Sequence, residues 1–314
     1  MIAITAGDPC GIGPEVIVKA LHALRARPRI PIAVIGDRTV FSRTLSALNL
    51  RLPSWVGFID CGHRSTFRPG HSSPHAGAAS LAYLERAMSL WREGRVHALV
   101  TAPVTKWAVA RAAAGFTGHT EYLAHRLHVR DVVMMFVSDA MRVVVLTRHL
   151  PLRRVSASLT RSTLQRSLSL IASGLRDGFH IRRPRLAVCG LNPHAGEGAS
   201  TSEERRVFRP AMQALRRRGV RCDGPFAADG FFANARTLNT YDAVICAYHD
   251  QGLIPFKMVA RDAGCQMTLG LPIVRTSPDH GSALDIAGRG IADPGSMLYA
   301  LTLAIRLTRH AQRA

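Results

Sequence analysis

Three histidines lie two to four residues after short apolar runs of the kind that form buried strands. They are His149, His194 and His249, which follow the runs Arg142–Thr147, Leu186–Gly190 and Ala243–Ala247. In open α/β sheets, ligands bind beyond the carboxyl ends of the strands. Three imidazoles at one such edge, with Asp250 beside them, suit a divalent ion such as Zn²⁺, Co²⁺ or Fe²⁺ and leave positions open for substrate oxygens. The pattern therefore predicts a metal centre.

A second interpretation of these histidines stays open. The chain has 14 histidines, and a lone histidine is more often a hydrogen-bonded structural or surface residue than a ligand. The long spacings also match no local metal motif. Only the shared position at strand ends favours a metal site over three unrelated residues.

Lysine is scarce in this chain. Only Lys19, Lys106 and Lys257 are lysines among 41 basic residues. Because arginine is used wherever a generic positive charge suffices, a lysine is a candidate for a role that needs a compact ammonium. Lys257, eight residues after His249, and Arg275 provide two cations for a phosphate or carboxylate. For Arg275 the alternative is a surface salt bridge.

Two turns invite an anion-binding interpretation. His119 and Thr120 precede a helical stretch, so their side chains and backbone amides can hold an anion at a helix start. Alternatively, Thr120 is an ordinary helix cap. Gly7–Glu15 lies between the first strand and the first helix, with Pro14 in the first helical turn. Since it is neither G-x-G-x-x-G nor a Walker A sequence, it predicts a tight turn only.

These residues need a scaffold with several strand ends at one edge. We expect strands at 2–5, 32–35, 96–101, 185–190 and 242–247, and helices at 14–24, 76–91 and 203–218. Such alternation predicts a mostly parallel sheet covered by helices. Residues 132–137 and 142–147 are an exception, since the short connection between them predicts an antiparallel hairpin and hence a mixed sheet. A further helix is expected after Ser277–Gly281.

Length and composition restrict the class of protein. The chain has 314 residues, 47% of them hydrophobic, which is enough for one large α/β domain or two lobes with a cleft between them. It contains no apolar run of membrane-spanning length and no secretory signal, so we expect a cytoplasmic protein without membrane contact. Its six cysteines form no CxxC pair, which predicts reduced and mostly buried thiols rather than a disulfide framework.

The formal net charge of +20 raises the alternative of a nucleic-acid-binding module. The arginines, however, are scattered through nearly every segment. Aromatic residues make up only 6% of the chain, and no aromatic residues interleave with the basic runs as they do in single-strand binding surfaces. We therefore expect no nucleic-acid partner.

Seven motifs, taken together and in order, resemble one family along essentially the whole chain. They are GDPCGIGPE, TAPVTK, FTGHTE, HLPLR, GLNPHAGEG, YHDQG and TLGLPIVRTSPDHGSALDIAGRG. The family is that of the 4-hydroxythreonine-4-phosphate dehydrogenases of pyridoxal phosphate biosynthesis. Any one of these motifs is weak, but the ordered series is specific.

The resemblance implies a two-lobed α/β fold similar to isocitrate and isopropylmalate dehydrogenases, with a mixed, mostly parallel sheet and an interlobe cleft. The implied first lobe is 1–116 plus 275–314, and the second is 117–274, carrying the metal ligands and the dimer contacts. The resemblance further implies a homodimer with a shared active site, and NAD or NADP bound without a Rossmann fingerprint. The cofactor-binding residues stay unassigned.

The resemblance also implies residue roles. His149, His194 and His249 bind one divalent metal (zinc, cobalt or magnesium), and the substrate is contacted by His119, Thr120, Lys257, Gln266 and Arg275. The catalytic residues are Lys257 and Asp250, with Asp250 or a metal-bound water as the acceptor of the alcohol proton. The implied reaction is NAD(P)-dependent oxidation and decarboxylation of 4-phosphohydroxy-L-threonine to 3-amino-2-oxopropyl phosphate.

Two departures from the family pattern keep alternatives open. Gln266 stands where the family usually has asparagine, and Ala199–Ser202 replaces a glycine-containing stretch. A related dehydrogenase acting on 4-phospho-erythronate or 4-phospho-threonate, or on a cis-dihydrodiol carboxylate, is therefore the second hypothesis. A metal hydrolase without nicotinamide is an alternative from a different class.

Overall fold

The computed structural model describes residues 1–63 and 66–311, which divide into two compact units. Unit 1 is Met1–His128, Asp262–Met267 and Leu271–Ala314, and unit 2 is Val129–Arg261 and Thr268–Gly270. The sequence led us to expect 1–116 plus 275–314 against 117–274. Residues up to His128 lie with unit 1 because Tyr122 and Arg126 both donate hydrogen bonds to Glu85.

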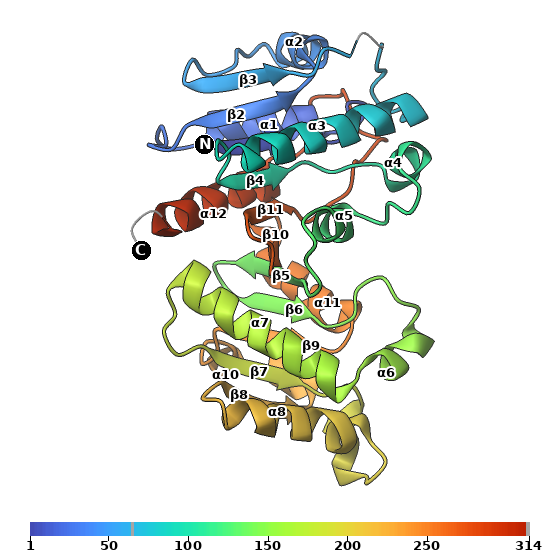
Figure 1. The fold of residues 1–314 in the computed structure, drawn as a ribbon, viewed down its shortest axis with the longest axis vertical. Helices are drawn as coiled ribbons and strands as arrows, with labels where there is room; N and C mark the ends of the chain where they lie inside the picture. Colours follow the sequence, from blue (N-terminus) through green and yellow to red (C-terminus); the bar gives the residue numbers. More distant parts are fainter. Residues whose placement is uncertain (64–65, 312–314) are drawn as a thin grey trace. The chain divides into compact units, whose positions relative to one another are not determined.

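Unit 1 is built on parallel strands in the order β3-β2-β1-β4-β11, followed by β10 (Figure 1). Their bounds are β1 Ile2–Thr5, β2 Ile32–Gly36, β3 Val56–Asp60, β4 Ala98–Thr101, β10 Gly264–Leu269 and β11 Val274–Pro278. Strands β1, β2 and β4 are buried along their whole length. Such burial explains their continuous apolar sequence, because strands covered on both faces lose the usual alternation.

Some helices of unit 1 begin where the sequence supplies a local start signal. They are α1 Gly13–Ala23, α2 Arg38–Ala47, α3 Pro74–Arg92, α4 Lys106–Ala112, α5 His119–Arg126 and α12 Gly295–Ala311. Pro14 lies in the first turn of α1, and the Ser73 side chain caps α3 by accepting from the Ala76 amide. A Cβ at Gly77 would lie 2.1 Å from the Ala108 carbonyl oxygen, so α3 and α4 pack at close range.

Unit 2 contains a mixed sheet in the order β5-β6-β9-β7-β8. Its strands are β5 Val133–Ser138, β6 Arg142–Val145, β7 Arg185–Cys189, β8 Arg221–Phe226 and β9 Ala243–Cys246. Strands β5 and β6 form an antiparallel hairpin, whereas the pairs β6–β9, β7–β9 and β7–β8 are parallel. The predicted hairpin and the predicted α/β class with a mixed, mostly parallel sheet are confirmed.

Helices of different lengths pack against this sheet (Figure 1). The segments are η1 Leu152–Arg154, α6 Val155–Ser158, α7 Arg161–Phe179, η2 Pro193–Gly198, η3 Glu204–Phe208, α8 Arg209–Arg216, α9 Ala228–Phe232, α10 Ala235–Leu238 and α11 His249–Ala260. The helix expected at 203–218 is present, but its first turn, η3, is a π-helix. π-Helical turns are rare overall, and many of those that occur lie at functional sites.

One sequence prediction about the fold is wrong. Residues after Gly281 form turns and extended segments instead of a helix, and the next helix, α12, begins only at Gly295. The backbone explains the failure, since Ala283, Gly288 and Gly290 all have positive φ, which a right-handed helix does not allow. Within the described residues, no helix has both the length and the apolar character needed to cross a membrane. All six cysteines are free, and all but Cys61 are buried.

Lys19 shows that a scarce lysine can be structural. Its Nζ atom donates to Glu15 Oε1 at 2.8 Å and to the carbonyl oxygens of Gly290 at 2.9 Å and Ala292 at 2.8 Å. The three tetrahedral donors of an ammonium fit three separate acceptors, which a planar guanidinium does not. Lys19 therefore joins α1 to the segment before α12.

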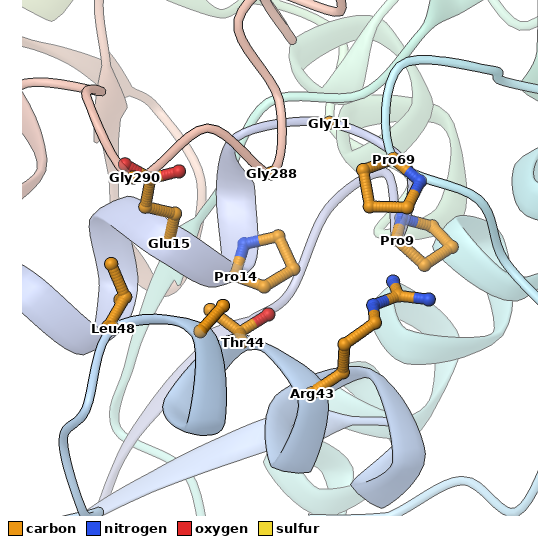
Figure 2. A pocket seen from close by; sticks show the side chains of 11 residues that line it. Pro9, Gly11, Pro14, Glu15, Arg43, Thr44, Leu48, Pro69, Gly288 and Gly290 are labelled. Carbon is orange, nitrogen blue, oxygen red and sulfur yellow. The ribbon is translucent and has the colours of Figure 1, made fainter.

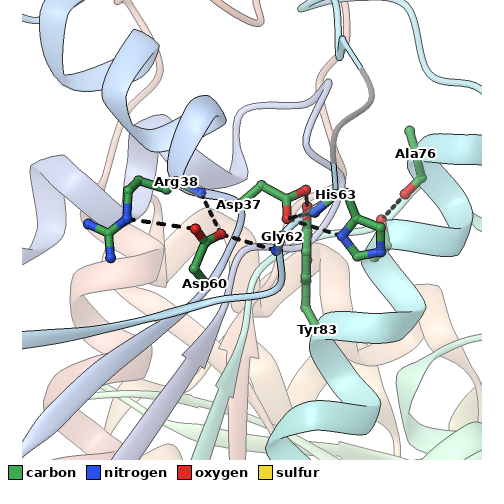
Figure 3. Close-up of polar contacts among 8 residues, drawn as sticks. Asp37, Arg38, Asp60, Gly62, His63, Ala76 and Tyr83 are labelled. Carbon is green, nitrogen blue, oxygen red and sulfur yellow. Dashed lines mark hydrogen bonds and ion pairs between the residues drawn. The ribbon is translucent and has the colours of Figure 1, made fainter.

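Asp37, at the end of β2, organises a buried polar network (Figure 3). Its carboxylate accepts hydrogen bonds from the Tyr83 hydroxyl at 2.5 Å and from the His63 backbone amide at 3.0 Å, and the His63 ring Nδ1 lies 3.0 Å away. Asp37 is 1% exposed and Tyr83 is fully buried. Burial strongly raises the pKa of Tyr83, and the hydrogen bond to Asp37 and the negative charge of Asp37 raise it further. The Tyr83 hydroxyl therefore keeps its proton and donates its hydrogen bond to Asp37.

We predict that Tyr83→Phe lowers the free energy of unfolding by about 1–3 kcal/mol, because it removes a donor from a buried carboxylate. Urea denaturation measures this loss. Tyr122→Phe is the matched control, since Tyr122 also donates to a carboxylate, that of Glu85, but both groups are only partly buried. Equal losses for the two variants would show that the Asp37 network contributes nothing beyond an ordinary surface contact.

Candidate active-site residues in the two units

Arg275 is the buried centre of a polar cluster in unit 1. It lies on β11 with 3% of its surface exposed. Its Nε and Nη2 atoms donate to Thr101 Oγ1 at 3.1 and 2.6 Å, and its Nη1 atom donates to Gln266 Oε1 and, at 3.4 Å, to Thr120 Oγ1. Gln266 Oε1 also accepts from Ser277 Oγ at 2.8 Å. Burial lowers the pKa of Arg275 to about 10, so the guanidinium stays charged at neutral pH.

The surface salt bridge considered for Arg275 is therefore wrong, and so is the helix cap considered for Thr120. The N-cap of α5 is Gly118, and no side chain caps this helix. Thr120 lies inside the first turn, is 2% exposed and receives a bond from Arg275. The structure brings three predicted substrate contacts together, namely Thr120, Gln266 and Arg275. It adds Thr101, which the TAPVTK motif contains but sequence reasoning did not single out.

His119 begins α5 beside this cluster and is partly buried. Burial lowers its pKa well below the usual range, and the positive charges of Arg275 and Lys106 lower it further. The imidazole is therefore neutral at physiological pH. A neutral imidazole can accept or donate a hydrogen bond without adding charge to the site.

The turn Gly7–Gly13 of unit 1 borders a small pocket of about 80 Å³ (Figure 2). Pro14 and Glu15 of α1, Arg43 and Thr44 of α2, and Gly288 line it. This volume is well below the roughly 300–1,000 Å³ of typical ligand pockets, so the pocket has room only for a small chemical group. Nearby, Gly11 approaches Ser282 so closely that a Cβ would lie 2.9 Å from the Ser282 carbonyl oxygen.

Several buried polar atoms of unit 1 lack a protein partner. They are Thr5 Oγ1, Thr105 Oγ1, His280 Nε2 and Ser282 Oγ. Buried polar atoms are nearly always hydrogen-bonded in native proteins, so each unpaired atom calls for an explanation. Thr5 ends β1, whereas His280 and Ser282 follow the end of β11. A polar ligand at the carboxyl ends of these strands would supply the missing partners.

In unit 2 the parallel pairing of β6 with β9 brings His149 close to His249. The pairing continues past both strands, since the Thr147 amide and hydroxyl donate to the Ala247 carbonyl oxygen. His149 lies two residues after Thr147, and His249 lies two residues after Ala247. The centroids of the two histidine rings are 6.1 Å apart. Two imidazoles on one tetrahedral ion have centroids about 5 Å apart for metal–nitrogen bonds of about 2.1 Å. A small side-chain movement therefore lets both rings bind one ion.

Asp250 orients the His249 ring. Its Oδ1 atom lies 2.6 Å from His249 Nδ1. A carboxylate that holds Nδ1–H leaves the Nε2 lone pair free for a metal, which is the usual arrangement behind metal-binding histidines. Asp250 itself is exposed, as is Lys257 in the last turn of α11. Lys257 lies about 12 Å along the helix from His249, at 1.5 Å per residue.

His194 lies on an unusual turn. The consecutive residues His194, Ala195, Gly196 and Glu197 all have left-handed backbone angles, with φ between 44° and 79°. For a residue with a side chain this conformation costs about 1–2 kcal/mol. The His194 side chain is 67% exposed, and its Nε2 atom lies 3.7 Å from Glu197 Oε1. Among the described residues, no group of three or more His, Cys, Asp or Glu side chains lies close enough to hold a metal.

The buried carboxylate of Glu204 contacts the segment that leads into this turn. Glu204 is 1% exposed, and its Oε1 accepts from the amides of Leu191 at 2.7 Å and Asn192 at 2.8 Å. Its Oε2 accepts from Asn192 Nδ2 at 3.0 Å. Burial raises the pKa of Glu204, but the hydrogen bonds from Asn192 and Leu191 outweigh this effect and leave the pKa below its ordinary value. Sequence reasoning missed this residue, although adjacent acids at 203 and 204 are notable in so basic a chain.

Comparison with known proteins identifies the family. Residues 25–304 match the family described as "Pyridoxal phosphate biosynthetic protein PdxA". The 4-hydroxythreonine-4-phosphate dehydrogenase of Burkholderia vietnamiensis is 43% identical over 98% of this chain and 97% of its own. The chain belongs to the PdxA family. The family resemblance predicted from the ordered motifs is therefore confirmed.

Solved structures agree with this family membership. The structure of 4-hydroxythreonine-4-phosphate dehydrogenase from Klebsiella pneumoniae is 34% identical, with a TM-score of 0.86 over 98% of this chain and 99% of that chain. A terephthalate 1,2-cis-dihydrodiol dehydrogenase from Burkholderia xenovorans is 30% identical, with a TM-score of 0.67 over 97% of both chains. Isocitrate dehydrogenase from Methylococcus capsulatus, at 16% identity and a TM-score of 0.54 over 99% of this chain and 87% of its own, shares the fold.

We predict that His119 makes stability depend on pH. Below about pH 6.5 the unfolded chain protonates this histidine, whereas the folded chain, with its lowered pKa, does not. Stability therefore falls as the pH drops from about 6.5 towards the folded pKa, by at most about 1.4 kcal/mol per pH unit for one proton. Urea denaturation of His119→Gln at pH 7.5 and 5.5 should show a smaller pH effect than the unaltered protein. An identical pH effect would contradict the neutral imidazole.

Proposed function

We propose that this protein is a metal-dependent, NAD(P)-linked 4-hydroxythreonine-4-phosphate dehydrogenase, which oxidises and decarboxylates 4-phosphohydroxy-L-threonine to 3-amino-2-oxopropyl phosphate. The observation that carries the proposal is the 43% identity, over nearly the full length of both chains, to an enzyme of that name. The geometry of the two units supports it independently, because each unit holds part of the chemistry that this reaction needs.

Unit 2 would hold the divalent ion. His149 and His249 are close together, Asp250 leaves His249 Nε2 available, and His194 is exposed on its strained turn. Imidazole ligands suit zinc or cobalt better than magnesium, which prefers oxygen. When bound, the ion supplies Lewis-acid stabilisation of negative charge on substrate oxygen. Asp250 has two roles in this proposal, since it holds the His249 ring and is a candidate acceptor of the alcohol proton.

Unit 1 would bind the substrate's anionic groups. Arg275 carries a buried positive charge held by Thr101, Thr120 and Gln266, so it needs little reorganisation when an anion binds. Neutral His119, beside the same cluster, would offer a hydrogen bond to the substrate. Lys257 of unit 2 is proposed as the phosphate ligand, because an ammonium is a strong point charge for phosphate.

NAD(P)⁺ would accept the hydride. The unpaired atoms Thr5 Oγ1, His280 Nε2 and Ser282 Oγ fit the hydroxyl and phosphate groups of a dinucleotide at the carboxyl ends of β1 and β11. This arrangement needs no G-x-G-x-x-G turn, in agreement with its absence from the sequence.

We also propose that the protein is a cytoplasmic homodimer that shares its active site between subunits. In one chain, His194 is not grouped with His149 and His249, which suits a site completed by a second copy. Ile254 and Met258 on α11 are 59% and 74% exposed and line an open pocket together with His194 and Asp250. Apolar side chains beside an incomplete polar site are typical of an interface.

The proposed activity predicts that 4-phosphohydroxy-L-threonine reduces NAD⁺ or NADP⁺. The reduced nicotinamide is followed by its absorbance at ~340 nm. Addition of Zn²⁺ or Co²⁺ to chelator-treated protein should restore turnover, whereas His249→Ala should abolish it. The second hypothesis is tested in the same assay. Turnover of 4-phospho-erythronate or a cis-dihydrodiol carboxylate, without turnover of 4-phosphohydroxy-L-threonine, would replace the proposed substrate. No reduction with any of them would favour a metal hydrolase.

Lys257→Ala should lower kcat/KM for the phosphorylated substrate by about 2–4 kcal/mol, as expected when one partner of a desolvated charge pair is lost. Lys257→Arg should mainly raise KM, because the planar guanidinium misplaces the phosphate. Folding and bound metal should be nearly unchanged in both variants. The decisive comparison is with the dephosphorylated substrate, and an equal loss on both substrates would remove Lys257 from the phosphate site.

A further inference from the structure

The proposed metal ligand His194 lies on a turn that the backbone alone does not favour. Three residues with side chains, His194, Ala195 and Glu197, adopt left-handed angles there. Such a turn persists only where surrounding contacts determine it. One side chain, Glu204, bonds the amides just before this turn and packs against Gly196 within it.

Glu204 lies directly beneath the turn. The backbone packs closely against its carboxylate, both before the turn and within it. A Cβ atom added at Gly190, before the turn, would lie 3.0 Å from Oε1, and one added at Gly196, within the turn, would lie 2.6 Å from Oε2. The Ala195 Cα at Gly190 (2.9 Å) and the Ser202 Oγ at Gly196 (2.7 Å) are about as close, so the carboxylate and its neighbours together restrict both positions to glycine. The short connection before η3 brings Glu204 into place, since Ser202 bonds the Ala199 carbonyl through its amide and reaches Gly196 with its side chain.

The hydrogen bonds continue from this turn to the start of α11. The carbonyl oxygen of Gly190, adjacent to the amide that Glu204 binds, accepts from Gln251 Nε2 at 2.7 Å. Gln251 Oε1 in turn accepts from the Ala247 amide at 2.6 Å. Gln251 and Ala247 lie on either side of His249. One chain of hydrogen bonds thus fixes the segments that carry His194 and His249.

We propose that Glu204 is a positioning residue for the metal site: its buried carboxylate preorganises the His194 turn and, through Gly190 and Gln251, couples it to His249. This inference rests on the proposed function, because it assumes that His194 and His249 bind a metal. It assigns a role to a residue that touches neither the metal nor the substrate. Supporting residues of this kind commonly change metal affinity about 10–100-fold when they are altered.

The chain offers a matched control for Glu204. Glu203 is its neighbour and also accepts from Asn192 Nδ2, at 2.7 Å, but its other partner is Ser156 Oγ and it bonds neither backbone amide of the turn. Glu203→Gln therefore changes the same charge and one shared contact without releasing the turn. In Glu204→Gln an NH₂ group, which cannot accept, replaces one carboxylate oxygen, so either the backbone amides or Asn192 Nδ2 lose their acceptor, and the remaining bonds lose the carboxylate charge.

The experiment titrates chelator-treated protein with Co²⁺ by calorimetry. Glu204→Gln should weaken Co²⁺ binding at least about tenfold, and the amides of Leu191 and Asn192 should exchange hydrogen faster in the metal-free variant. Glu203→Gln should change neither quantity. Unchanged Co²⁺ affinity in folded Glu204→Gln, even with a lower thermal midpoint, would show that Glu204 is merely structural and would overturn the proposal.

Two further measurements separate this proposal from the proposed function. If the unaltered protein binds no Co²⁺, or if His194→Ala binds it as well as the unaltered protein, the proposed metal site fails and this inference fails with it. If Glu204→Gln does not fold, Glu204→Asp carries the test, because it keeps the charge but shortens the side chain and withdraws the carboxylate from the backbone amides of Leu191 and Asn192. A weaker Co²⁺ affinity in folded Glu204→Asp supports the proposal, and an unchanged affinity overturns it.

Discussion

The parallel pairing of β9 with both β6 and β7 is the constraint on which the chemistry of unit 2 depends. Val244 is opposite Val143 on one side and Ala187 on the other, so the three strands run in the same direction and end nearly level. The residues that leave these ends must emerge at one edge of the sheet. A register shift of one residue would bury the wrong face of each strand and displace every side chain at that edge.

Much of this arrangement could be predicted from sequence, because it follows from hydrophobic pattern. Buried strands such as Ile2–Thr5 read as continuous apolar runs, and the polar residues after such runs mark the functional edge. Pattern also identified the hairpin of β5 and β6. It failed after Gly281, where the residues do not forbid a helix by type but the backbone adopts positive φ, a property that depends on tertiary contacts.

Side-chain partners were harder to predict than elements. For Arg275 the sequence suggested an anion-binding cation but left a surface salt bridge open, because arginine is usually exposed. In the structure three distant segments supply the oxygens that make its burial tolerable. Glu204 gave no motif, since its role depends on backbone amides of a turn a dozen residues away. Lys19 shows the opposite error, because its scarcity pointed to chemistry but its three acceptors are structural. Composition therefore shows which residue types are scarce, whereas the contacts in the structure show what role each of those residues has.

The central claim is that the strand-end histidines of unit 2 form one metal centre. Anomalous diffraction at the cobalt edge from crystals grown with Co²⁺ tests it most directly. We expect one strong peak per site within about 2.0–2.2 Å of imidazole nitrogens of His149, His194 and His249, with the contributing chains showing whether the site is shared by two subunits. A peak at other residues, or no peak in crystals of protein that binds Co²⁺ in solution, would contradict the claim.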